Sequence, residues 1–360
     1  MKVNGQASKT IRALAGGLAV EIIDQTALPF AFERRVLTTW RECVEAIALM
    51  RVRGAPLIGV TGAWAMALAT KEGVREDYLR ACAAEIAAAR PTAVNLSWAV
   101  GRMLDALLAV PESGRSLAAR SLAAEITDED EAVCRAIGRT GAQVIEALYE
   151  KLGRPVNVLT HCNAGWLATV DNGTALSPVF TAHDAGVPVK VWVEETRPRN
   201  QGLLTAWELR EHGIEHTLLC DNAGGHLMQH GLVDLVIVGA DRITRTGDTA
   251  NKIGTYLKAL AARDCGLPFY VAAPASTFDG TLENGLSDIE IEERSGAEVR
   301  FVEGTDEAGR RARVRIAPDE EPVTNPAFDV TPARLITGFM TEKGLLAPGA
   351  LAEALFGAQA

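Results

Sequence analysis

The spacing of the hydrophobic residues changes near residue 155 of the chain. Before that point apolar residues recur at helical spacing, in the segments 40–50, 58–69, 77–89 and 96–107. Beyond Pro155 short apolar runs alternate with amphipathic segments, and these runs lie at 156–160, 189–193, 216–219, 233–238 and 268–272. Strands that alternate with helices in this way predict a parallel sheet with right-handed crossovers.

The ends of the chain and its middle follow other patterns. Between residues 9 and 38 the pattern is short and strand-like, with a turn at Leu28-Pro29, so a small hairpin of strands at 20–23 and 30–37 is expected. Residues 111–120 break the helical pattern, and 122–152 predict one or two long helices. The tail from residue 344 to residue 360 is expected to form an Ala/Leu-rich helix.

These patterns predict an α/β protein with two domains. A mainly helical N-terminal domain with a small β-sheet is expected over residues 1–125, and a parallel-sheet domain over 126–360, including a linking helix at about 126–152. The length of 360 residues agrees with two domains, at roughly 150 residues per domain. The longest apolar stretch, residues 57–69, is shorter than the roughly 20 residues that span a bilayer, so no membrane segment is expected.

Charge and cysteine content narrow the class of partner. A net charge of −10 and a pI near 5.3 argue against broad binding to nucleic acid, which needs a basic surface, so an anionic ligand would need a local basic pocket. The six cysteines show no CxxC pair and no dense spacing, which predicts a reduced, cytoplasmic protein.

Two residues with reactive side chains follow two of the predicted strands. His161-Cys162 comes directly after the run 156–160, and Asp241 comes shortly after the run 233–238. Ligands of open α/β sheets bind outside the carboxyl ends of parallel strands, so this thiol and this carboxyl are a candidate acid/base pair. Taken singly, Cys162 fits a small buried hydrophobic residue and Asp241 fits a helix N-cap equally well.

Other polar positions suit a phosphate group. Arg53-Gly54-Ala55-Pro56 precedes an apolar helix, where a guanidinium and open backbone N–H groups can bind phosphate, although a plain loop fits as well. Arg90-Pro91-Thr92 repeats this arrangement, and Asn251-Lys252 precedes a helix expected at 253–262. Together these signals predict a site for a phosphorylated small molecule.

No cofactor or metal is expected. The first strand of the alternating half is followed by Asn163-Ala164-Gly165-Trp166 rather than by a dinucleotide-binding glycine fingerprint, and no Walker-type lysine loop occurs. His226 and His230 are four residues apart on a predicted helix, but they lack the glutamate of a zincin motif and an obvious third ligand.

At the positions of the candidate acid/base pair and of the predicted phosphate contacts, the chain resembles the methylthioribose-1-phosphate isomerases. These enzymes are relatives of the regulatory subunits of the eukaryotic translation initiation exchange factor. The resemblance runs from about residue 50 to about residue 340 and is carried by the motifs RGAPLIG, RPTAVNLSWA, THCNAGWLAT, EETRPRNQG, LTAWEL, DNAGGHLM, VGADRI, GDTANKIGTY, IEERS and NPAFDVTPA. It implies a mainly helical N-terminal domain, a Rossmann-like C-terminal domain and a homodimer.

The resemblance also implies an activity and a set of site residues. The family converts 5-methylthioribose 1-phosphate to 5-methylthioribulose 1-phosphate in methionine salvage. Carried over by motif, Cys162 is the catalytic thiol and Asp241 the proton donor. The residues carried over as substrate contacts are Arg53, Gly54, Ala55, Arg90, Gln201, Asn251 and Lys252.

Two departures from the family pattern leave the substituent on carbon 5 open. Trp166 stands where smaller residues are common, and Asp171-Asn172-Gly173 replaces a stretch with glycine and tyrosine. The alternatives are isomerisation of 5-deoxyribose 1-phosphate or of ribose 1,5-bisphosphate, for which Arg197 and Arg199 could supply a second cationic pocket. A third alternative is a non-catalytic regulatory paralogue that senses a sugar phosphate, although the presence of both Cys162 and Asp241 argues against it.

Overall fold

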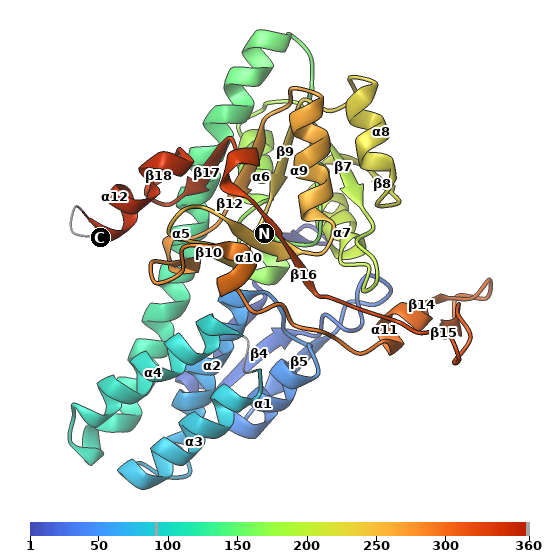
Figure 1. Cartoon of the computed structure of the whole chain (residues 1–360). Coiled ribbons are helices and arrows are strands. Elements are labelled where there is room, and N and C mark those ends of the chain that lie inside the picture. Colours follow the sequence, from blue (N-terminus) through green and yellow to red (C-terminus); the bar gives the residue numbers. More distant parts are fainter. Residues whose placement is uncertain (91–92, 358–360) are drawn as a thin grey trace. The chain divides into compact units, whose positions relative to one another are not determined.

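The computed structural model describes residues 1–90 and 93–357 (Figure 1). It divides into two compact units, the first made of Met1–Arg135 with Ala164–Thr174 and the second of Ala136–Asn163 with Ala175–Ala360. Helix α5 (Glu112–Leu152) runs through the boundary predicted between residues 125 and 126, and that boundary stays a prediction. Pro91 and Thr92 of the predicted phosphate-binding motif lie outside the described residues.

The first unit combines small antiparallel sheets with helices. Its strands are β1 (Lys2–Val3), β2 (Gln6–Ala7), β3 (Ile11–Leu14), β4 (Ala19–Ile23) and β5 (Arg34–Leu37). Its helices before α5 are α1 (Trp40–Ala48), α2 (Ala55–Ala69), α3 (Glu76–Ala88) and α4 (Val94–Leu108), as expected. The expected hairpin is instead a three-stranded sheet of order β3-β4-β5, because the Ile11–Leu14 segment also pairs with β4.

Helix α2 is the centre of the first unit. It is apolar on all sides, so it is buried along almost its whole length against α1, α3 and α4. A Cβ atom on Gly62 would lie 2.5 Å from the Leu96 side chain of α4, so glycine is needed for the two helices to approach this closely.

The second unit is built on a seven-stranded sheet that confirms the predicted parallel arrangement (Figure 1). Its strands are β6 (Val156–Thr160), β7 (Val189–Glu194), β8 (Glu215–Leu219), β9 (Leu235–Val238), β12 (Phe269–Ala272), β17 (Gly338–Thr341) and β18 (Gly344–Leu346). The order is β18-β17-β12-β9-β6-β7-β8, and β18 alone is antiparallel to its neighbour. The helices that follow the strands are α6 (Ser177–Asp184), α7 (Gly202–His212), α8 (Ala223–Gln229) and α9 (Thr255–Asp264).

A second sheet of four short strands was not predicted. Its order is β13 (Phe278–Asp279), β10 (Arg242–Thr244), β11 (Thr249–Lys252) and β16 (Phe328–Thr331). Asn251 and Lys252 therefore lie in a strand, and the helix after them begins at Thr255 rather than at residue 253. Between β13 and β16 the chain forms α10 (Gly285–Asp288), α11 (Ala297–Arg300) and the hairpin of β14 (Phe301–Thr305) and β15 (Arg311–Arg315).

Two further expectations were wrong. Residues 112–120 do not break the helical pattern, because Pro111 stands just before the first residue of α5, where a proline is tolerated. The tail is not one helix: it begins with strand β18, which pairs with β17, and only Leu351–Phe356 form helix α12. Among the described residues no helix is both long enough and apolar enough to cross a membrane.

Candidate functional site

Cys162 and Asp241 follow neighbouring strands at the centre of the seven-stranded sheet. Strands β6 and β9 run parallel, with Val158 opposite Leu235 and Leu159 opposite Val236. The chain moves outward in one direction from β6 through β7 to β8, and in the other direction from β9 through β12 to β17. The carboxyl ends of β6 and β9 are thus the topological switch point, where α/β sheets bind their ligands.

The backbone of Cys162 is held in an unusual conformation. Its φ of 69° is in the left-handed region, which residues with a side chain rarely adopt. The Cys162 N–H donates to Thr196 Oγ1 at 2.8 Å, and Thr205 Oγ1 donates to the Cys162 carbonyl at 2.8 Å. Thr196 follows β7 and is itself at φ 64°. Such strained residues cluster at functional sites, so their presence here supports a functional role for this turn.

The four-stranded sheet places Asp241 beside the segment that carries Asn251 and Lys252. The Asp241 N–H donates to the Ala250 carbonyl at 2.9 Å, and Arg242 is paired with Ala250 in the antiparallel β10–β11 ladder. Asn251 and Lys252 are 4% and 8% exposed, which is uncommon for residues of these types.

The Lys252 ammonium links the candidate acid/base pair. Burial lowers the pKa of Lys252, while the nearby Cys162 and Asp241 raise it and Arg294 and Arg199 lower it further. The Lys252 Nζ also lies 4.6 Å from the centre of the Phe328 ring. The Cys162 thiol and the Asp241 carboxyl, from two strand ends, therefore both lie near enough to Lys252 to raise its pKa.

Gln201 lies just before helix α7 and is 8% exposed. Its side-chain oxygen Oε1 is buried and has no hydrogen-bond partner in the described part of the chain. Buried acceptors are normally satisfied, so this atom fits the substrate contact that the sequence predicted for Gln201.

The remaining predicted contacts belong to the first unit. Gly54 has a φ of 90° and precedes α2, and a Cβ there would lie 2.4 Å from the Ala168 carbonyl oxygen, so only glycine fits. Ala55 is the first residue of α2, whose amino end offers backbone N–H groups to an anion. Arg53 and Arg90 are half-buried near the starts of α2 and α4.

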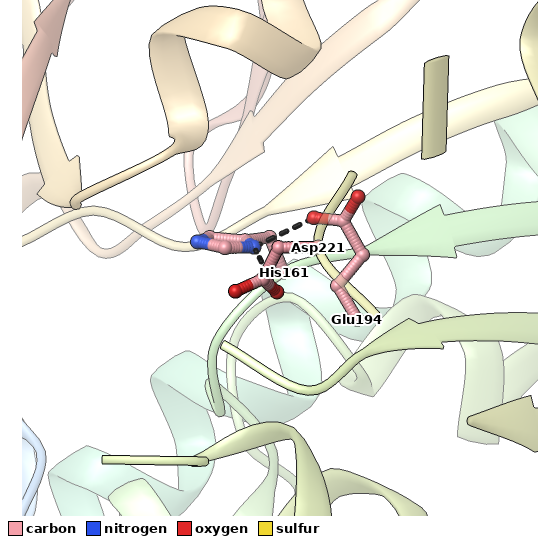
Figure 2. Close-up of side chains that lie close together, drawn as sticks. All are labelled: His161, Glu194 and Asp221. Atoms are coloured by element: carbon pink, nitrogen blue, oxygen red, sulfur yellow. Dashed lines mark hydrogen bonds and ion pairs between the residues drawn. The ribbon is translucent and has the colours of Figure 1, made fainter. Parts of the chain in front are cut away.

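A cluster of charged residues includes His161, the residue before Cys162. Figure 2 shows three of its members, His161, Glu194 and Asp221. His161 Nδ1 is 2.7 Å from Glu194 Oε2, and Lys258 Nζ is 3.3 Å from the same oxygen. Asp221 Oδ1 lies 4.0 Å from His161 Nδ1. The sequence singled out His161 only as the residue before Cys162. Lys258 was missed, because a lysine within a helix gives no signal of its own.

His161, Glu194 and Asp221 are spaced closely enough to suggest a metal site, since one ligand atom of each lies within 4.8 Å of the others. These atoms already have protein partners, however. The backbone N–H groups of Thr196 and Arg197 donate to the two oxygens of Asp221 at 2.7 and 2.8 Å. The Lys258 ammonium takes a place where a cation would bind. We therefore interpret the cluster as a hydrogen-bond network.

The arginines considered for a second phosphate already have protein partners. Arg197 donates to the carbonyls of Pro198 and Val299 at 2.8 and 3.0 Å, and Arg199 forms an ion pair of 2.8 Å with Glu298. Burial raises the pKa of Glu298, but the hydrogen bond from Arg294 and the charge of Arg199 outweigh it and lower the pKa to about 2. The carboxylate of Glu298 thus neutralises the guanidinium of Arg199.

Trp166 is 1% exposed, in the short 3-10 helix Trp166–Ala168. Its indole therefore has almost no surface with which to contact a substrate. Trp166 can therefore influence the binding of the carbon 5 group only through the residues that pack against its indole.

Comparison with known proteins agrees with this architecture. The model of the Initiation factor 2 subunit family matches residues 51–348. Methylthioribose-1-phosphate isomerase of Rhodospirillum centenum is 57% identical over 96% of this chain and 93% of its own. The structure of 5-methylthioribose 1-phosphate isomerase from Pyrococcus horikoshii is 39% identical, with a TM-score of 0.84 over 98% of this chain and 95% of that chain.

A solved structure of a translation initiation factor subunit is similar to this chain to about the same degree. Translation initiation factor eIF-2B, subunit delta, from A. fulgidus is 39% identical, with a TM-score of 0.82 over 97% of this chain and all of that chain. From the matched residues and from these relatives, we conclude that the chain belongs to the Initiation factor 2 subunit family, IF-2B.

Proposed function

We propose that this protein is an aldose-ketose isomerase that converts 5-methylthioribose 1-phosphate to 5-methylthioribulose 1-phosphate in methionine salvage. The observation that carries the proposal is the position of Cys162 and Asp241 after β6 and β9, around the ammonium of Lys252. The 57% identity to a methylthioribose-1-phosphate isomerase over nearly the whole chain supports this substrate.

The chemistry explains why an acid is needed. The substrate is a closed furanose whose anomeric carbon bears phosphate, so it cannot open to an aldehyde by the spontaneous route of free sugars. Asp241 is proposed as the general acid that protonates the ring oxygen as its bond to carbon 1 breaks. The residue precedes β10, where its main chain is fixed by the hydrogen bond to Ala250.

The local charge balance favours one proton on the acid/base pair. Cys162 and Asp241 both raise the pKa of Lys252, while Arg199 and Arg294, which lower it, are both paired with Glu298. One proton on the pair leaves a single negative charge to balance the charge of Lys252, whereas two anions would leave one buried negative charge in excess. The family resemblance assigns that proton to Asp241, which makes Asp241 the proton donor and Cys162 the thiolate.

Two routes lead from the opened sugar to the ketose. In the first, the Cys162 thiolate removes the proton of carbon 2, and the enediol-type intermediate is reprotonated at carbon 1. In the second, a hydride moves directly from carbon 2 to carbon 1, and Cys162 shapes the site or handles the hydroxyl proton. Turnover in deuterated water decides between them: deuterium at carbon 1 of the product supports the thiolate base, and its complete absence supports the hydride shift.

Arg53 and Arg90 are proposed to bind the phosphate, because the planar guanidinium matches phosphate oxygens better than a point charge does. Gly54, Ala55, Gln201, Asn251 and Lys252 are proposed as further substrate contacts. Alanine at either arginine is expected to raise KM, and an unchanged KM would remove that arginine from the phosphate site.

The group at carbon 5 distinguishes the proposed substrate from the two alternative sugar phosphates. Ribose 1,5-bisphosphate needs a second cationic pocket, but Arg197 donates to backbone carbonyls and Arg199 is neutralised by Glu298. The test is an assay of the purified protein with methylthioribose 1-phosphate, 5-deoxyribose 1-phosphate and ribose 1,5-bisphosphate. We expect the highest kcat/KM for the first, and the proposal fails if the bisphosphate is preferred or if none of the three is converted.

The alternative to an enzyme is a regulatory protein without catalytic activity. The similarity to the eIF-2B delta structure allows it, but that similarity is 39%, against 57% for the isomerase of Rhodospirillum centenum. Conversion of methylthioribose 1-phosphate by the wild-type protein but not by a Cys162→Ala variant would exclude a purely regulatory role.

We further propose that the protein is a cytoplasmic homodimer. None of its six cysteines, all of them in the described part of the chain, forms a disulfide, which suits a reducing compartment. The homodimer is expected from the family resemblance. Light scattering coupled to size-exclusion chromatography measures the mass directly: twice 38.3 kDa supports the dimer, and a mass of 38.3 kDa excludes it.

A further inference from the structure

The imidazole ring of His161 has an oxygen atom facing each of its two nitrogens. Nδ1 lies 2.7 Å from Glu194 Oε2, and Nε2 lies 2.8 Å from the backbone carbonyl oxygen of Ile253. A neutral imidazole carries one N–H, so it cannot donate to both oxygens. The two contacts therefore require an imidazolium beside an ionised Glu194, or a proton on Glu194 that is shared with Nδ1.

Acidic groups lie around the ring. The carboxyl groups of Glu194 and Asp221 lie 2.7 and 4.0 Å from His161 Nδ1, Glu194 also pairs with Lys258, and Asp329 interacts electrostatically with both basic residues. Burial raises the pKa of Asp329, and the charges of His161 and Lys258 act in the opposite direction. In either arrangement of the proton, the polar atoms of the ring are matched by the groups around it.

These contacts tie together three chain segments at the carboxyl edge of the sheet. His161 directly precedes Cys162, Glu194 is the last residue of β7, and Ile253 directly follows Lys252. The ring is also packed against Gly254, where a Cβ would lie 3.2 Å from ring atoms Cε1 and Nε2. One side chain, 2% exposed, therefore joins the turn that carries the thiol to the segment that carries the ammonium.

We propose that His161 is a positioning residue, which bridges Glu194 and the Ile253 carbonyl and thereby fixes the Cys162 thiol relative to the Lys252 ammonium. Since the ring is 2% exposed, it has almost no surface for a substrate and acts through the residues that it contacts. Its effect on turnover rests on the proposed isomerase function, whereas its effect on the thiol does not. A displacement of about 1 Å in a catalytic group can cost about 100-fold in rate, so loss of the bridge should be visible in kcat.

The experiment compares two conservative variants with a matched control. His161→Asn retains an amide near the position of Nδ1, and His161→Gln retains one near the position of Nε2, so each can keep one of the two contacts but not both. The control is His216→Gln. His216 lies half-buried on β8 of the same sheet, and its Nδ1 contacts a single carbonyl, that of Ile214, at 2.8 Å.

Four quantities are measured on each full-length protein: the melting temperature, kcat, KM, and the rate at which iodoacetamide alkylates Cys162. Mass spectrometry of peptides assigns the alkylation, since Cys220 is exposed and Cys265 is partly exposed. We expect both His161 variants to lower kcat by about 10- to 100-fold at a temperature where they are folded, and to change the alkylation rate of Cys162 several-fold. The control is expected to match wild type in kcat and in alkylation.

A purely structural role for His161 would lower the melting temperature and leave kcat and Cys162 alkylation of the folded protein unchanged, and this result overturns the proposal. A lower kcat with unchanged alkylation also overturns it, because the effect would then not reach the thiol. If wild-type protein converts no sugar phosphate, the proposed function fails, while the alkylation comparison still tests the positioning role. Should one His161 variant not fold, the other and Glu194→Gln provide the same comparison.

Discussion

Replacement of Glu194 by glutamine tests the charge of the buried network directly. The Glu194 side chain is fully buried, and its Oε2 is shared by His161 Nδ1 at 2.7 Å and Lys258 Nζ at 3.3 Å. An amide has the same shape but no charge. If its oxygen takes the place of Oε2, both basic groups lose their counter-ion, and if its NH₂ group does, it faces the ammonium of Lys258.

The magnitude follows from the charges that remain. Breaking a buried ion pair by removing one partner costs about 3–5 kcal/mol, because an uncompensated charge stays buried. Asp221 lies 4.0 Å from His161 Nδ1, and Asp329 also interacts with both basic groups, so part of the compensation remains. We therefore expect the lower end of that range, about 3 kcal/mol of unfolding free energy, which corresponds to a melting temperature lower by about 6–12 °C for a unit of this size.

Thermal unfolding followed by circular dichroism measures the shift. The matched control is Glu215→Gln, since Glu215 forms an ion pair of 3.2 Å with Lys190 on the same sheet but its side chain is 70% exposed. An exposed pair contributes about 0–1 kcal/mol, so this control should change the melting temperature by no more than about 4 °C. Equal melting temperatures for Glu194→Gln and wild type would show that the network does not depend on the carboxylate charge.

Three further predictions concern the acid, the packing of the network, and the dependence of stability on pH through Glu298. Asp241→Asn keeps the size of the side chain and removes the acid, so kcat should fall by about 100-fold or more with an unchanged circular dichroism spectrum; near-normal turnover would contradict the role of Asp241. Gly224→Ala places a Cβ 2.2 Å from Glu194 Oε1 and should destabilise the protein by about 1–3 kcal/mol in urea unfolding, whereas Gly225→Ala on the same helix meets only Ala261 at 3.7 Å and should be neutral or slightly stabilising. The pKa of Glu298 is lowered to about 2 from an ordinary 4.5, so its stabilising contribution is present above pH 4.5 and is lost as the pH falls toward 2. The stability difference between wild type and Glu298→Gln should therefore shrink between pH 7 and pH 3, and a constant difference would refute this assignment.

Periodicity predicted the elements of the sheet well, because strands buried on both faces are continuous apolar runs. The run 156–160 is strand β6 at the same bounds, and the run 189–193 differs from β7 by one residue. The short strands β10, β11 and β16 were missed for the opposite reason. They are three or four residues long and carry polar side chains such as Asn251 and Lys252, so they have no apolar pattern.

The sequence by itself determined the parallel sheet, the helical first unit and the polar residues that follow the strands, because each depends on the local spacing of residue types. The tertiary structure decided which of these polar residues meet. Strand order places β6 next to β9 although 74 residues separate Thr160, the last residue of β6, from Leu235, the first of β9, and the pairing of β10 with β11 brings Asp241 beside the Lys252 segment. The bridge from His161 to Glu194 and Ile253 likewise depends on three segments that are distant along the chain. Local pattern cannot specify such contacts, because they depend on the order in which the strands pack.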